Sequence, residues 1–135
     1  MNNYIVGLEH IGIFTPDIQK SEDFYINKLG FELISREQCP KNGGTLLMCF
    51  IKAGSCIIEL VQPVDASVAE KRIDGKVDHI SLKVNDLDAA TADLKQKGIQ
   101  FETESTIDVP IFKNGIKVIF FKGAFGERLE LCQTL

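Results

Sequence analysis

A short phrase occurs twice in this chain. Residues 8–14 read LEHIGIF and residues 77–83 read VDHISLK, so each copy places an acid, a histidine and an isoleucine in a strand-like run. His10 and His79 are the only two histidines among the 135 residues. A repeated segment constrains the fold strongly, because it predicts two copies of one supersecondary unit.

The repeat extends well beyond the phrase when His10 is aligned with His79. Each histidine is followed by a helical segment that opens with an aspartate and ends with a glycine, as helix starts and stops commonly do. The predicted helices cover residues 17–30 and 86–98, and their buried stripes are Ile18, Phe24 and Leu29 and then Leu87, Ala90 and Leu94. The predicted strands that follow are 31–35, 44–52 and 55–63 in the first copy and 99–103, 115–122 and 127–133 in the second. The sequence therefore predicts an α+β fold of two tandem β-α-β-β-β modules.

Length and composition favour one globular domain over residues 1–135. We place module one at about 5–63, a polar linker at 64–76 and module two at about 77–135. Hydrophobic residues make up 44% of the chain, enough for a core, and the net charge of −4 argues against nucleic acid as a partner. We see no signal peptide and no apolar run of membrane-spanning length. The four cysteines lack paired spacing, so we expect free thiols and a cytoplasmic protein.

Strand alternation assigns the polar residues of the repeat to one face of each sheet. His10 and His79 alternate with isoleucines on their strands, and Glu59 and Glu130 lie at matching places on the last strand of each module. All four side chains are expected to point away from the helices. Two imidazoles and two carboxylates suit nickel, zinc or cobalt, with manganese or magnesium also possible. The alternative is that each histidine is an ordinary hydrogen-bonded strand residue beside an exposed glutamate.

At these residues the chain resembles the vicinal oxygen chelate superfamily, which includes glyoxalase I, methylmalonyl-CoA epimerase, dioxygenases and antibiotic-resistance proteins. The resemblance covers essentially the whole chain. Its marks are EHIGI (9–13), FYINKLGF (24–31), IIELVQP (57–63), DHISLKVNDLDAA (78–90) and FFKGAFGERLEL (120–131). It implies a half-open mixed-sheet barrel around one metal, with His10, Glu59, His79 and Glu130 as ligands, and a homodimer.

The occupied ligand positions favour the glyoxalase I and epimerase branch of this superfamily. We predict a metal-dependent lyase or isomerase of the glyoxalase I type, resembling lactoylglutathione lyase. It would convert the hemithioacetal of methylglyoxal and a thiol to a hydroxyacyl thioester through a metal-bound enediolate. The alternatives are an acyl-CoA epimerase like methylmalonyl-CoA epimerase, and a metal-free protein that binds a small molecule such as an antibiotic. Phe14 stands where glyoxalase I typically carries an arginine for glutathione.

Both candidate reactions remove a proton from a carbon beside a carbonyl group. By resemblance, Glu130 is the expected general base and Glu59 its counterpart, each serving as metal ligand and catalytic residue. The substrate is expected to be a thiol adduct or an acyl thioester. Cys132 shares the face of Glu130 and is either a reactive thiol or a buried inert one. Residues 104–114 are either a loop over the site or an ordinary connection.

Overall fold

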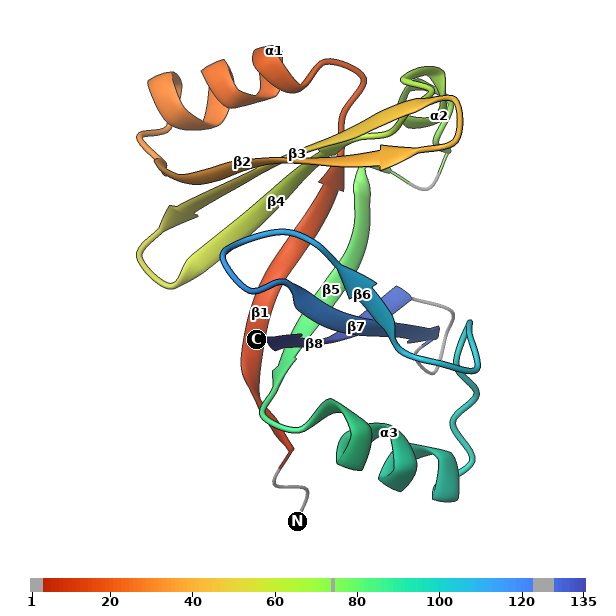
Figure 1. Cartoon of the computed structure of the whole chain (residues 1–135). Helices are drawn as coiled ribbons and strands as arrows, with labels where there is room; N and C mark the ends of the chain where they lie inside the picture. Colours follow the sequence, from red (N-terminus) through yellow and green to blue (C-terminus); the bar gives the residue numbers. More distant parts are fainter. Residues whose placement is uncertain (1–3, 74, 123–127) are drawn as a thin grey trace. The chain divides into compact units, whose positions relative to one another are not determined.

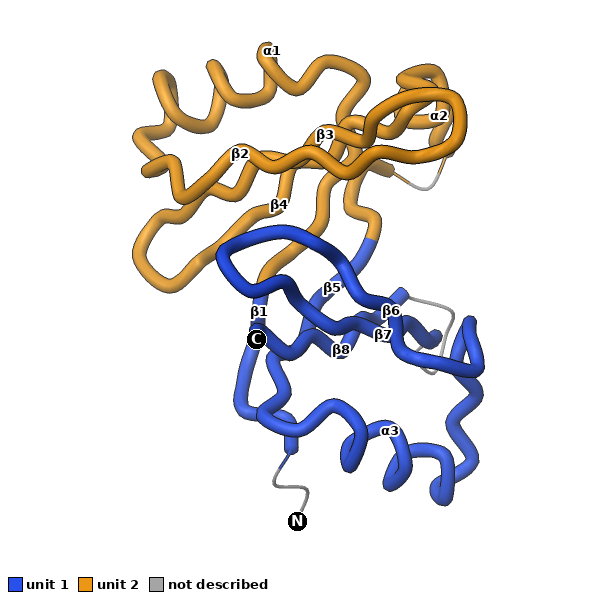
Figure 2. The backbone as a smooth tube through the Cα atoms, viewed as in Figure 1, with its two compact units in different colours: residues 1–9, 79–135 blue, residues 10–78 orange. Residues whose placement is uncertain are grey.

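The computed structural model describes residues 4–73, 75–122 and 128–135, and it divides into two compact units (Figure 2). Unit 2 comprises residues 10–78, and unit 1 comprises residues 1–9 together with 79–135. Strand β1 (Ile5–Phe14) therefore contributes its first half to unit 1 and its second half to unit 2. These units are compact parts of the structure and do not test the expected modules at 5–63 and 77–135, which remain a prediction from the sequence repeat.

Unit 2 is a mixed sheet with a helical segment on one face (Figure 1). Its strand order is β2-β3-β4-β1, with β4 parallel to β1 and the other pairs antiparallel. The helices pack through Ile18 onto Cys49, Ile51, Ile58 and Leu60. Its remaining elements are α1 (Ile18–Glu22), η1 (Asp23–Lys28), β2 (Glu32–Lys41), β3 (Gly44–Ala53), β4 (Cys56–Gln62) and α2 (Ser67–Glu70).

Unit 1 repeats this plan with a shorter edge strand. Its strand order is β5-β8-β7-β6, with β5 parallel to β8 and the other pairs antiparallel. Leu87 and Ala90 of the helix are completely buried against Ile119, Phe121 and Leu131. Its elements are β5 (Val77–Val84), α3 (Leu87–Gln96), β6 (Ile107–Val109), β7 (Ile116–Lys122) and β8 (Arg128–Thr134). The α+β class is confirmed, with parallel and antiparallel pairing in both units.

Both helices begin in the same way. Asp17 accepts a hydrogen bond from the amide of Lys20, and Asp86 accepts one from the amide of Ala89, so both predicted caps are confirmed. A glutamine of the last strand adds a second bond to each first turn. The amide of Ile18 donates to Gln62 Oε1 at 2.9 Å, and the amide of Leu87 donates to Gln133 Oε1 at 2.8 Å. Each helix start is thus tied to the strand that carries the glutamate.

The first helix departs from its prediction after one turn. Residues 23–28 form a π-helix, whose i→i+5 bonds add a residue to each turn and shift the buried stripe along the chain. Tyr25 and Ile26 consequently pack on the core, whereas Phe24 is 47% exposed and Leu29 is 54% exposed. The predicted stripe is therefore wrong at these two positions. The stripe of the second helix is confirmed, since Leu94 packs with Leu87 and Ala90.

The predicted strand at 99–103 is also wrong. Within 99–103 only Phe101 makes a bridge, to Phe121. The edge strand is β6, which lies inside the segment 104–114 that we expected to be either a loop over the site or an ordinary connection. Ile99 and Phe101 satisfy their apolar pattern by packing on the helix side of the core. A turn in which Thr103 Oγ1 donates to the carbonyl of Ser105 then separates them from β6. The first residue of the predicted strand 127–133 lies outside the described residues, as do residues 123–126 before it.

No helix in the described ranges is both long enough and apolar enough to cross a membrane.

Candidate functional site

Unit 2 brings His10 and Glu59 together. His10 lies on β1, and Glu59 lies on β4 in register with Gly12, two residues further along β1. His10 Nε2 is 3.3 Å from Glu59 Oε1, and the two residues are only 3% and 8% exposed. Phe50 on β3 pairs with Glu59 and places its ring edge-on to the imidazole, with 5.7 Å between ring centroids. The neighbours Ile58 and Leu60 enter the helix-side core, as alternation predicts.

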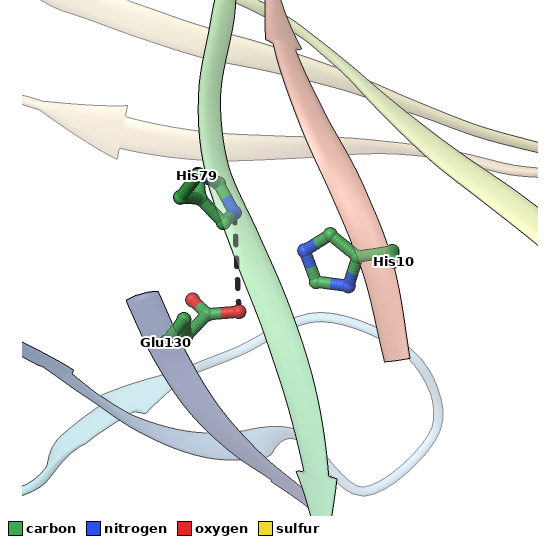
Figure 3. A group of neighbouring side chains, drawn as sticks. All are labelled: His10, His79 and Glu130. Carbon is green, nitrogen blue, oxygen red and sulfur yellow. Dashed lines mark ion pairs between the residues drawn. The ribbon is translucent and has the colours of Figure 1, made fainter. Parts of the chain in front are cut away.

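Unit 1 contains the matching pair, His79 and Glu130 (Figure 3). Glu130 on β8 is in register with Ser81, two residues beyond His79 on β5. His79 Nε2 is 3.9 Å from Glu130 Oε1, and the residues are 6% and 5% exposed. Phe120 on β7 pairs with Glu130 and meets the imidazole edge-on at 5.6 Å. The sequence repeat is thus reproduced down to the aromatic contact.

Each pair has the composition and spacing of two ligands for one divalent ion. Ligand bonds of about 2.0–2.2 Å at tetrahedral or octahedral angles place neighbouring donor atoms about 2.8–3.6 Å apart. The 3.3 Å between His10 and Glu59 falls in this range, and the 3.9 Å between His79 and Glu130 is a few tenths of an ångström longer. Burying a carboxylate beside an imidazole is costly unless the charge is compensated, so such buried pairs suit a cation. The residues present therefore fit a divalent metal.

In unit 1 a cation stacks on the aromatic ring that contacts the histidine of the pair. The guanidinium carbon of Arg128 lies 3.9 Å from the centroid of the Phe120 ring, whose edge meets His79. Arg128 also donates from Nε and Nη2 to both carboxylate oxygens of Glu102, at 3.0 and 2.9 Å. Ile57 stands at the corresponding place before Glu59, two residues earlier on β4. An aromatic residue nine or ten positions before each glutamate was the available sequence signal for Phe50 and Phe120.

A second arginine organises the connection in unit 2. The Arg72 guanidinium lies 5.0 Å from the centroid of the Phe14 ring and donates from Nη1 to Asp78 Oδ1 at 2.7 Å. Its Nε donates to the carbonyl of Gly75. These contacts join the end of β1 to the start of β5.

A cavity of about 620 Å³ in unit 2 lies between α1, η1 and the strands β2 and β3. Its lining includes Glu22 and Arg36, which form an ion pair at 2.7 Å, and neither His10 nor Glu59 belongs to it. The hydrogen bond and charge of Glu22 raise the pKa of Arg36.

All four cysteines are free thiols, and Cys132 is 2% exposed.

Comparisons with known proteins show the family and the fold of the chain. The family model of the glyoxalase/bleomycin resistance protein/dioxygenase superfamily matches residues 9–120. The chain is 33% identical to human mitochondrial methylmalonyl-CoA epimerase over 134 residues, covering 94% of this chain and 73% of that protein. It is also 33% identical to the ethylmalonyl-CoA/methylmalonyl-CoA epimerase of Cereibacter sphaeroides over 96 residues, covering 67% and 70%. The crystal structure of methylmalonyl-CoA epimerase from Mycobacterium tuberculosis shares the fold, with a TM-score of 0.82, 23% identity and coverage of 100% and 93%.

These relatives correct the main functional prediction. A glyoxalase I or lactoylglutathione lyase type of enzyme is wrong, because the named relatives are epimerases, the class held as its alternative. The physical reason for the error is that the ligand set alone does not distinguish the two chemistries. The residue that argued against glyoxalase I was Phe14, and in the structure the guanidinium of Arg72 lies over the Phe14 ring. The family itself is shown by the match over most of the chain: this protein belongs to the glyoxalase/bleomycin resistance protein/dioxygenase superfamily.

Proposed function

We propose that the protein is an acyl-CoA epimerase that acts on methylmalonyl-CoA or a closely similar 2-alkylmalonyl thioester. The observation that carries this proposal is the 33% identity to the human epimerase across 94% of the chain. The buried His–Glu pair of each unit supports it, because epimerisation beside a thioester carbonyl requires a base and stabilisation of negative charge.

The proposed ligands of one divalent ion are His10, Glu59, His79 and Glu130. All four are buried, and two carboxylates with two neutral imidazoles balance the charge of a divalent cation. Nickel, zinc and cobalt suit this mixture of nitrogen and oxygen donors best, and manganese and magnesium are the harder alternatives. When bound, the ion would supply Lewis-acid stabilisation of the charge that develops on the substrate.

Glu130 and Glu59 are the proposed acid–base residues. Epimerisation removes the proton from C2 of the acyl group and returns a proton to the opposite face, so it needs one group to accept and another to donate. The duplicated fold provides a carboxylate for each role. Because Glu59 and Glu130 are only 8% and 5% exposed, bulk water has little access to them, which protects the carbanion from uncontrolled protonation.

Proton exchange in heavy water tests these roles separately. Wild-type protein is expected to incorporate deuterium at C2 of methylmalonyl-CoA and to interconvert its two epimers. Glu130→Gln and Glu59→Gln should each lower epimerisation by about 10²–10⁴-fold, the usual contribution of a positioned acid or base. If the two residues serve opposite faces, each variant still exchanges the proton of one epimer without inverting it. Glu104→Gln, at an exposed position of unit 1, is the matched control.

Turnover that is unchanged in both glutamine variants would contradict the assignment of the bases. A wild-type protein with no activity on methylmalonyl-CoA or ethylmalonyl-CoA would contradict the proposed function. Metal content is measured independently by mass spectrometry of protein purified without added metal. About one divalent ion per chain is expected, and His79→Ala should lose it.

We also propose a homodimer, on the basis of the family resemblance. Ile5, Val6 and Leu8 at the start of β1 are 36%, 57% and 50% exposed, which is compatible with an interface in that region. Light scattering coupled to size-exclusion chromatography should give twice the chain mass of 15.0 kDa. Leu8→Glu should shift that mass toward the monomer, and a wild-type mass of one chain at micromolar concentration would contradict the proposal.

A further inference from the structure

The two His–Glu pairs differ at one position beside the glutamate. Gly12 is in register with Glu59, whereas Ser81 is in register with Glu130. Glycine therefore suffices at this place in one copy of the repeat, and the other copy carries a hydroxyl group. Residues paired across neighbouring strands lie about 4.8 Å apart with their side chains on the same face. Ser81 Oγ and the Glu130 carboxylate are accordingly neighbours on the face that carries His79.

The Ser81 hydroxyl is buried without a hydrogen bond. Ser81 is 0% exposed, and its Oγ has no partner among the residues that the structure describes. An unsatisfied buried hydroxyl destabilises a protein, so a serine here disfavours folding relative to alanine or glycine. Buried polar groups without a partner are rare in native proteins, and some of them have a role at a functional site. The complete burial of this side chain argues against a direct contact with the substrate.

From these observations we infer that Ser81 is a positioning residue for Glu130, donating a hydrogen bond to its carboxylate during catalysis. The inference rests on the proposed function, in which Glu130 both holds the metal and moves the proton. A carboxylate that changes between these tasks must reorient, and the neighbouring hydroxyl then gains the acceptor that it lacks in the resting arrangement. Glu59 has no such donor from its paired residue, because Gly12 has no side chain. The two glutamates are therefore chemically unequal despite the repeat.

Substitution of Ser81 tests the inference with two readouts. Ser81→Ala should lower the affinity for Co²⁺, measured by calorimetry, by about 10–100-fold, as loss of a hydrogen-bond partner of a metal ligand commonly does. It should also change the visible absorption spectrum of the bound Co²⁺. With methylmalonyl-CoA, kcat should fall by a similar factor while KM stays within about threefold, because Ser81 does not contact the substrate. The thermal midpoint should stay the same or rise, since the variant removes an unsatisfied hydroxyl.

Two further variants separate positioning from a general effect on packing. Ser81→Thr keeps the hydroxyl and should restore most of the Co²⁺ affinity and kcat. Ser35→Ala removes the other buried hydroxyl that lacks a partner among the described residues, which is on β2 in register with Phe50 rather than with a carboxylate. This control should leave Co²⁺ affinity and kcat unchanged.

The outcomes distinguish the inference from the function on which it rests. If wild-type protein binds Co²⁺ and epimerises the substrate, and Ser81→Ala matches it within twofold in both assays, the role of Ser81 is refuted and the function stands. The role of Ser81 is likewise refuted if Ser35→Ala impairs both assays as much as Ser81→Ala does. If wild-type protein neither binds Co²⁺ nor exchanges the C2 proton, the proposed function fails and the role of Ser81 fails with it.

Discussion

Replacing Gln133 with leucine should destabilise the protein by a predictable amount. The Gln133 side chain accepts a hydrogen bond of 2.8 Å from the amide of Leu87, the first residue of α3. Leu87 is 0% exposed, so its amide cannot form a hydrogen bond with water when the acceptor is lost. Leaving such a buried donor unsatisfied costs about 1–3 kcal/mol. Leucine nearly preserves the size of the side chain, and the change therefore isolates the hydrogen bond.

The repeat offers an internal comparison for this prediction. Gln62 accepts a hydrogen bond from the amide of Ile18 at 2.9 Å, and Ile18 is 7% exposed. The loss of unfolding free energy in Gln62→Leu should therefore lie in the lower half of the same range. The two bonds share no partner, and the effects in the double variant should add to within about 0.5 kcal/mol. Gln100→Leu, at an exposed position, is the control and should change stability by less than about 0.5 kcal/mol.

Urea unfolding monitored by circular dichroism measures these changes in free energy. A thermal melt provides a second measurement. A chain of this size shifts its thermal midpoint by roughly 4 °C per kcal/mol, so Gln133→Leu should melt about 4–12 °C below wild type. A Gln133→Leu variant as stable as Gln100→Leu would refute the reasoning, because the Leu87 amide would then have found another acceptor at no cost. A strongly non-additive double variant would refute the independence of the two helix starts.

Three further outcomes follow from the described contacts. Arg128→Met removes the guanidinium from the face of Phe120 and from Glu102, and should cost about 1–2 kcal/mol in urea unfolding. Burial raises the pKa of Cys49 from 9.0 to about 12, so the native state favours the thiol form. Stability should therefore be complete below pH 9 and fall by up to about 1.4 kcal/mol per pH unit from pH 9 toward 12, a dependence that Cys49→Ala should reduce. Zn²⁺ in 100-fold excess over its dissociation constant should stabilise the protein by about 2.7 kcal/mol, and chelation should reverse this in a thermal melt.

The pairing of each histidine with its own glutamate could be predicted because it depends only on strand alternation and the repeat. Once His10 and Glu59 lie on adjoining strands, side-chain parity places both on the face opposite Ile58. The same holds for His79 and Glu130. These inferences need no knowledge of rotamers or of long-range packing, which explains why they are confirmed within each unit.

The errors have a different origin. The π-helix at 23–28 is accompanied by contacts just beyond its end, since Tyr25 meets Phe31 edge-on at 5.5 Å and its carbonyl accepts a hydrogen bond from the Phe31 amide. The prediction assumed a helical period of 3.6 residues, and a π-helix changes this period and moves the buried stripe. Likewise, the stacking of Arg128 on Phe120 depends on side-chain conformations that a sequence pattern does not determine. The choice between epimerase and lyase failed because the resemblance led us to expect the same four residues in both enzyme types, and only Phe14 offered a distinguishing signal.

The differences between the two copies of the repeat bear on how the proposed reaction runs. A two-base epimerase works in both directions, so each carboxylate must act as an acid in one direction and as a base in the other. The two bases meet epimers of opposite configuration at C2, so their surroundings need not be identical. In this chain Ser81 is in register with Glu130 where the other copy has Gly12, and Arg128 precedes Glu130 by two residues where the other copy has Ile57. Under the proposed function, duplication supplies the two carboxylates, and these unlike neighbours give each carboxylate different surroundings.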